Sequence, residues 1–173
     1  MADTRAHPEP VLIRVEKPSD HAEIARLTTL AFAPQPYAAG DEAEVVDRLR
    51  SHRALALSLV AVSGTAIVGH AAFSPADGSD DQHWFALGPI SVHPSRQHQG
   101  IGTMLIKQGL DQLKAWSAAG CILTGNPAYY QRFGWQPSPS NAPTNEPAEF
   151  FMVKLLSGRL PTGRFAFHRA FYG

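Results

Sequence analysis

The chain has 173 residues, of which 15 are Lys or Arg and 15 are Asp or Glu, so its formal net charge is zero. With no basic excess to neutralise a phosphate backbone, the composition argues against nucleic acid as the main partner. Apolar residues make up 44% of the chain and charged residues 17%, which argues against disorder. The single cysteine, Cys121, can form neither an internal disulfide nor a thiolate metal cluster.

This length predicts one domain over residues 1–173, with a flexible polar lead at 1–10. The lead lacks the apolar region of a secretory signal. No apolar run reaches the 18 or so residues that span a bilayer, so a membrane partner is not expected. We therefore expect a cytoplasmic protein.

The first half of the chain predicts a strand, two helices and a hairpin. The helices are marked by apolar residues at helical spacing, and the first of them by Asp20 and Glu23 as a capping pair. Ser63-Gly64 supplies the hairpin turn, which implies antiparallel pairing. In chain order the elements are a strand at 11–15, a helix from 20 to before Pro34, a helix at 41–50, and strands at 55–62 and 65–73.

The second half centres on a strand, a long helix and a second strand. Gly88-Pro89 interrupts the first strand and indicates a bulge, because proline cannot donate to a sheet ladder. The elements are a strand at 84–92, a helix from about Gly100 to 119–120 with Gly120 after its end, a strand at 121–123, a short helix at 126–132, a loop at 137–148, and two final strands at 150–156 and 164–168. This order predicts an α/β sandwich with a largely antiparallel sheet.

The junction at residues 97–102, Gln-His-Gln-Gly-Ile-Gly, is the segment whose residues indicate a ligand-binding site. The first N–H groups of a helix have no partner inside it, and the helix dipole adds positive charge there. Gly100 and Gly102 lack Cβ atoms, so a ligand can approach the backbone closely. Together these features favour an anion site for a pyrophosphate. The residues match neither a Walker loop nor the three-glycine dinucleotide motif.

A second motif, Asn126-Pro-Ala-Tyr-Tyr-Gln-Arg-Phe-Gly-Trp135, follows the long helix. Together with Gly88 to Pro94 and the Gln97–Gly102 loop, it resembles the GNAT superfamily of acetyl-CoA-dependent N-acetyltransferases, most closely the bacterial YhbS-like subgroup. The resemblance covers residues 11–170 in element order and is specific in residue detail over 86–135. It implies a three-layer α/β/α sandwich whose mixed sheet is splayed at the central strands.

The resemblance also implies roles for individual residues. Ile90, Ser91 and Val92 would pair through their backbone with the pantetheine arm. Tyr130 would act as general acid near the thioester sulfur, and Asn126 would contact the pantetheine or polarise the site. The pyrophosphate would be held by main-chain N–H groups of Gln97, His98, Gln99, Gly100, Ile101, Gly102 and Thr103.

Two departures from the family pattern leave parts of the site open. The loop carries His98 and Gln99 where many relatives have a basic residue, so Arg96 is the nearest cation. The strand at 84–92 lacks the glutamate that serves many relatives as base. The alternatives for the base are His83, His70, or a water chain that reaches Asp80 or Asp81. The acceptor pocket is expected from loops near 33–40, 75–83 and 137–148.

The predicted function is transfer of an acetyl group from acetyl-CoA to a primary amine of a small molecule, peptide or protein, by direct attack. The alternative is a non-catalytic acyl-CoA-binding sensor, which the missing glutamate and the weakly basic loop favour. No metal is expected, since the histidines near the site lack ligand spacing. The partners are therefore acetyl-CoA and an amine, and the family resemblance also suggests a homodimer.

Overall fold

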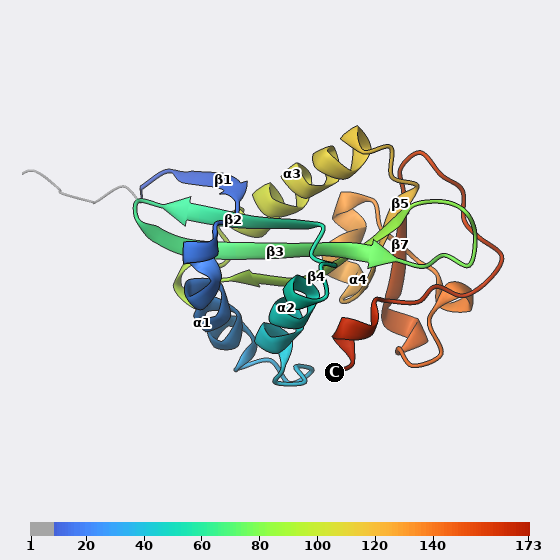
Figure 1. Ribbon diagram of the computed structural model, residues 1–173, viewed down its shortest axis with the longest axis horizontal. Helices are drawn as coiled ribbons and strands as arrows, with labels where there is room; N and C mark the ends of the chain where they lie inside the picture. Colours follow the sequence, from blue (N-terminus) through green and yellow to red (C-terminus); the bar gives the residue numbers. More distant parts are fainter. Residues whose placement is uncertain (1–8) are drawn as a thin grey trace, which may run out of the picture.

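The computed structural model describes residues 9–173, so the predicted lead lies outside the described residues up to Pro8. A seven-stranded sheet carries helices on both faces (Figure 1). The strands are β1 (Val11–Val15), β2 (Leu57–Ser63), β3 (Ala66–Ala76), β4 (Trp84–Val92), β5 (Gly120–Thr124), β6 (Gln136–Pro137) and β7 (Phe151–Leu155). The helices are α1 (His21–Phe32), α2 (Glu42–Ser51), α3 (Ile101–Ala115) and α4 (Pro127–Tyr130).

The strand order β1-β2-β3-β4-β5-β7-β6 confirms the predicted mixed, mostly antiparallel sheet. β2 and β3 form the predicted antiparallel hairpin. β4 and β5 form a parallel pair, and α3 makes the crossover between them, because parallel neighbours need a long connection. Among residues 9–173, no helix combines the length and the apolar character that crossing a bilayer requires.

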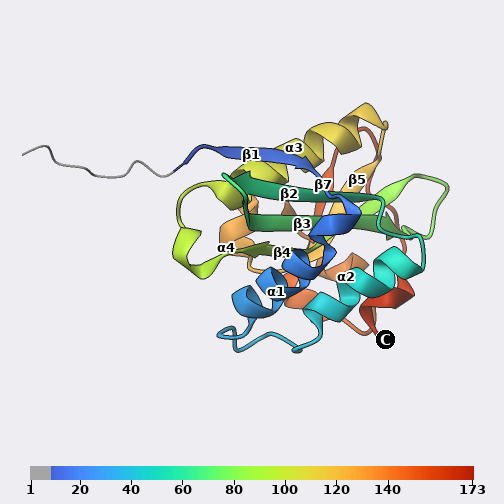
Figure 2. The same ribbon diagram turned by 60° about the vertical axis from the view of Figure 1, so that its left-hand side comes forward.

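The helices divide between the two faces of the sheet (Figure 2). On one face, Leu105 and Ile106 of α3 belong to a large apolar cluster with side chains of β2, β3 and β5. A Cβ atom on Gly109 would lie 2.1 Å from the Phe73 ring, so the glycine lets α3 approach β3 closely. On the other face, Ile24 of α1 and Val46 of α2 pack on Val60 of β2. This arrangement confirms the α/β/α sandwich.

Three local predictions were wrong. Residues 164–168 form no strand, because their β-pairing within residues 9–173 is limited to one bridge, Asp77 to Ala166, and Phe165 and Phe167 pack into a core instead. The strand that pairs with β7 at the edge of the sheet is instead β6. It has only two residues and ends at Pro137, so the sequence shows no strand pattern there. Gly120 belongs to β5, and Ser117 at φ 57° takes the left-handed position after α3.

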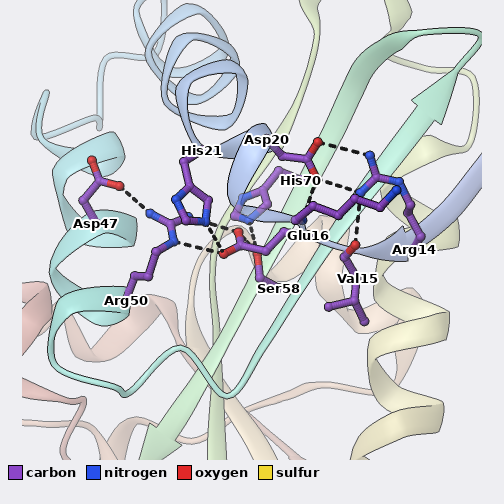
Figure 3. A network of polar contacts seen from close by, with 10 residues as sticks. Arg14, Val15, Glu16, Asp20, His21, Asp47, Arg50, Ser58 and His70 are labelled. Carbon is purple, nitrogen blue, oxygen red and sulfur yellow. Dashed lines mark hydrogen bonds and ion pairs between the residues drawn. The ribbon is translucent and has the colours of Figure 1, made fainter.

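A chain of polar contacts joins α2 to the sheet (Figure 3). The carboxylate of Glu16 accepts two hydrogen bonds from the Arg50 guanidinium, both at 3.0 Å, and one from the Ser58 hydroxyl at 2.5 Å. Burial opposes its charge, but Arg50 and Ser58 outweigh burial and lower the pKa of Glu16. The carboxylate is therefore ionised at neutral pH.

The ionised Glu16 fixes the hydrogen bond between Ser58 and His70. Because a carboxylate only accepts, the Ser58 hydroxyl donates to Glu16 and must accept from the His70 Nε2–H, at 2.8 Å. The proton of the neutral ring is thus on Nε2. Nδ1 is buried without a partner among the described residues. Burial lowers the pKa of His70 to about 4, so the ring is neutral at pH 7.

We predict that His70 makes the protein less stable as the pH falls from 7 to 5. In the unfolded chain His70 has the ordinary histidine pKa of about 6.5, so it binds a proton between pH 7 and pH 5. In the folded chain the His70 ring stays neutral until the pH approaches about 4. The free energy of unfolding should therefore fall by about 2 kcal/mol more in the wild type than in His70→Gln. Urea denaturation at pH 7 and pH 5 measures this difference, and equal losses in both proteins would contradict it.

Candidate active site at the start of α3

The start of α3 presents unpaired main-chain donors. Gly100 precedes the helix with φ 82°, and no side chain of the described residues caps it. The first helical hydrogen bond runs from the Met104 N–H to the Gly100 carbonyl at 3.0 Å. Within residues 9–173, the N–H groups of Ile101, Gly102 and Thr103 therefore donate to no protein acceptor. A Cβ atom on Gly100 would meet nothing within 4 Å, so the space beside this helix end is open.

Polar side chains of the loop that precedes α3 form hydrogen bonds within the loop and to the neighbouring strands. Gln97 Nε2 donates to the Val92 carbonyl at 3.2 Å, and Arg96 Nε donates to Gln99 Oε1 at 2.9 Å. Arg96 also donates to the Ser63 hydroxyl at 3.2 Å. His98 has the left-handed φ of 62°. Arg96, the nearest cation, thus has two neutral partners within the protein, and the N–H groups at the start of α3 are main-chain donors without an acceptor among the described residues.

A gap opens between β4 and β5 beside this helix end. The two strands pair only from Trp84–Ala86 to Gly120–Ile122. Beyond Ala86, β4 continues to Val92 with β3 as its strand neighbour, and β5 continues with β7. The β3–β4 register also shifts near the Gly88-Pro89 interruption. This divergence is the splay that the resemblance implied.

The predicted pantetheine contacts, Ile90, Ser91 and Val92, lie on the part of β4 that has left β5. Ile90 and Val92 pack toward the α3 side of the sheet. Ser91 is buried, and its hydroxyl has no partner in the part of the chain that the structure describes. The backbone of this segment therefore borders the gap on its β5 side.

The α4 segment lies next to the start of α3. Asn126 Oδ1 caps α4 by accepting from the Ala128 N–H at 3.0 Å. A Cβ atom on Gly102 would lie 2.8 Å from the Tyr129 hydroxyl, so α3 and α4 meet at these two residues. The two motifs predicted from the sequence are thus adjacent in space.

Tyr130 is a partly buried residue of α4. Its ring stacks edge-on against Tyr129, with 4.9 Å between centroids, and against Trp135. Burial raises the pKa of Tyr130 well above its usual value, with smaller contributions from Tyr129 and Tyr37. Tyr37 belongs to the α1–α2 connection, so Tyr130 has neighbours from the second motif and from that loop. The group therefore keeps its proton at neutral pH.

None of the candidate bases predicted from the sequence is exposed at the gap. His70 is buried and bonded to Ser58. His83 and Asp80 precede β4, at the end where β4 and β5 are still paired, and Asp80 accepts from the Trp84 indole at 3.1 Å. The loop 75–83 accordingly packs against residues 159–166.

The loop 137–148 contributes a carboxylate that the sequence analysis did not single out. Glu146 accepts from the Thr124 hydroxyl at 3.0 Å and from the Tyr172 hydroxyl at 2.8 Å. Thr124 is the last residue of β5, beside the gap. The only available signal was the presence of an acidic residue in a loop expected to border the acceptor pocket.

Other hollows and possible metal ligands lie outside this arrangement. A hollow of about 260 Å³ is lined by residues such as Lys114 and Lys154, and one of about 520 Å³ by residues such as Arg50 and Trp116. Neither is lined by residues of the two motifs. Within residues 9–173, no group of three His, Cys, Asp or Glu side chains is arranged to hold a metal ion. The candidate site is therefore the start of α3 together with the gap between β4 and β5.

Comparison with known proteins identifies the family. Residues 22–135 match the family model described as Acetyltransferase (GNAT) family. The chain is 35% identical over 128 residues to the uncharacterized N-acetyltransferase YhbS of Escherichia coli K12, covering 73% of this chain and 74% of YhbS.

Two solved structures share the fold over nearly the whole chain. A GNAT family acetyltransferase from Brucella melitensis, in complex with acetyl-CoA, is 41% identical with a TM-score of 0.83, covering 94% of this chain and 99% of that one. Escherichia coli YhbS in complex with CoA is 30% identical with a TM-score of 0.84, covering 96% and 97%. The chain therefore belongs to the GNAT family of acetyltransferases and is an acyltransferase.

Proposed function

We propose that this chain transfers the acetyl group of acetyl-CoA to a primary amine. The observation that carries the proposal is the start of α3, where the N–H groups of Ile101, Gly102 and Thr103 have no acceptor among the described residues and the space beside Gly100 is open. Such a helix end favours a phosphate group. The Brucella melitensis relative and YhbS, which share this fold, were solved with acetyl-CoA and with CoA.

The residues at the gap fit the parts of acetyl-CoA. The N–H groups of residues 97–103 would hold the diphosphate, and the open side of Gly100 leaves room for it. The free backbone edge of Ile90, Ser91 and Val92 would pair with the pantetheine arm, whose amides can extend a strand. Asn126 uses its side-chain oxygen for α4, so its amide NH₂ is the part that would reach the cofactor.

The chain's main contribution to the reaction is to hold two substrates in one geometry. The amine must lose a proton before it attacks, and the oxyanion that then forms needs a donor, which a free N–H of β4 can provide. As the N–C bond forms and the C–S bond breaks, the amine gives up two protons. One of these protons goes to solvent, and the other returns to Tyr130, which has supplied its own proton to the departing thiolate.

Three further points belong to this proposal. Residues 9–173 act as one catalytic domain, because a single sheet runs through them. The reaction takes place in the cytoplasm, and the buried unpaired thiol of Cys121 fits a reducing compartment. A homodimer stays a prediction from the family resemblance.

The first test removes the open space at the phosphate seat. Gly100→Ala places a side chain at φ 82° beside the free N–H groups, and should weaken acetyl-CoA binding about tenfold or more, measured by calorimetry. Gly40→Ala is the matched control, because Gly40 has φ 89° and equally open surroundings but lies in the α1–α2 connection. Equal acetyl-CoA affinities for the two variants would contradict the placement of the diphosphate.

The second test removes the proposed acid. Tyr130→Phe keeps the ring packing against Tyr129 and Trp135 but has no proton to give, so kcat for thiol release should fall about 100-fold. The dissociation constant for acetyl-CoA should stay within about twofold of the wild-type value. Tyr129→Phe is the control for loss of a neighbouring hydroxyl group. A kcat for Tyr130→Phe that matches this control would exclude Tyr130 as the acid.

A further inference from the structure

We infer that Glu146 binds the positively charged amino group of the acceptor, which makes cationic primary amines the substrate class. The inference rests on the proposed function, since it assigns the second substrate of the same site. Glu146 would supply the carboxylate that β4 lacks between Trp84 and Val92.

The Glu146 carboxylate is positioned by two hydroxyl groups. Thr124 donates to Oε2 at 3.0 Å and Tyr172 donates to Oε1 at 2.8 Å. These partners are 22 and 26 residues away in the chain, so the side chain is held by tertiary structure. A carboxylate offers about four lone-pair sites, and the two hydroxyl groups use only two of them. The remaining sites can accept hydrogen bonds from a ligand.

Glu146 has no positive partner of its own. None of the ion pairs among residues 9–173 includes it, although its residue is partly buried. Glu16, by contrast, is bonded to Arg50. A partly buried charge without a counter-charge is costly, and a bound ammonium group removes that cost. Glu146 is therefore suited to a cationic ligand.

The carboxylate stands on the side of the sheet opposite α3. Cys121 and Leu123 of β5 belong to the α3-side core, whereas Ile122 packs on the other face, so by alternation Thr124 points to that other face. Phe171, the residue before Tyr172, is the nearest side chain to Gly88 on β4, at 4.0 Å from an ideal Cβ. The C-terminal residues thus reach from the β4 interruption to Glu146 at the end of β5.

This placement separates the two substrates. The free N–H groups of α3 and the α4 motif lie on one face of the sheet, and Glu146 lies on the other face at the same gap. An acceptor that binds Glu146 approaches the thioester from the side that the diphosphate does not use. Tyr172, which is 47% exposed, stands beside Glu146 and offers aromatic surface to the rest of the acceptor.

The Glu146 carboxylate can also accept the proton that the ammonium group must lose before the nitrogen attacks. The ammonium group donates to Glu146, the proton passes to the carboxylate and then to solvent, and the neutral nitrogen forms the N–C bond as the C–S bond breaks. Tyr172 keeps its proton and positions the carboxylate, since its hydrogen bond to Glu146 needs a donor.

The experiment compares Glu146→Gln with Glu149→Gln in the full chain saturated with acetyl-CoA. The probes are tyramine and the amide of Nα-acetyl-lysine, each with one primary amine, and the readouts are steady-state thiol release and calorimetric binding of acetyl-CoA. Glu149 is exposed in the same loop and forms no hydrogen bond among the described residues through its side chain. Both changes remove one negative charge, so the pair controls for net charge.

We expect Glu146→Gln to raise the amine KM about tenfold or more, with acetyl-CoA affinity and melting temperature unchanged, and Glu149→Gln to stay within about twofold of wild type. Equal KM values for the two variants would overturn the inference. A wild type that binds acetyl-CoA but acetylates neither probe would overturn it as well, while leaving cofactor binding intact. Failure of the wild type to bind acetyl-CoA would instead overturn the proposed function.

Discussion

The proposed binding of acetyl-CoA depends on a few main-chain N–H groups that have no partners among residues 9–173. They occur where α3 begins, and the helix cannot satisfy them because its own carbonyls lie further along the chain. Their direction is fixed by packing. Leu105 and Ile106 are fully buried, and Gly109 lets the helix lie against Phe73. A rigid helix therefore presents polar groups to open space, and a phosphate is the ligand that such groups favour.

The gap between β4 and β5 lies beside the start of α3, where the proposed cofactor would extend from its diphosphate. Three residue pairs join the two strands, after which β4 follows β3 and β5 follows β7. The unpaired parts of β4 and β5 therefore lie between the two layers of helices, with α3 and α4 packed on one face of the sheet. A reaction between two substrates that enter from opposite faces needs an opening of this kind. In the proposed mechanism, the sheet both holds the fold together and separates the binding surfaces of the two substrates.

The polar contacts of β1–β3 have a different role from those at the gap. Glu16, Arg50 and Ser58 satisfy one another, and His70 completes the chain in its neutral form. Such buried networks contribute to a single defined structure when their members are paired. Glu146 differs because its charge has no cationic partner in the described protein. Both carboxylates accept hydrogen bonds, but only Glu16 has a cationic partner, and this difference is what supports the proposed binding role of Glu146.

Much of this architecture could be predicted from the sequence, because its signals are local. The helical spacing after Gly100, the turn at Ser63-Gly64 and the loop glycines each depend on nearby residues, and the structure contains all three features. The β6 strand and the irregular segment at 164–168 depend instead on distant partners, as the single bridge from Ala166 to Asp77 shows. The environment of Glu146 likewise comes from Thr124 and Tyr172, which no local pattern connects to it.

A crystal structure of the wild-type protein with CoA would test the central claim most directly. The account predicts that diphosphate oxygens accept hydrogen bonds from the N–H groups of Ile101, Gly102 and Thr103, with the thiol end of CoA in the gap near Tyr130. A diphosphate bound elsewhere, with these N–H groups facing only water, would contradict it.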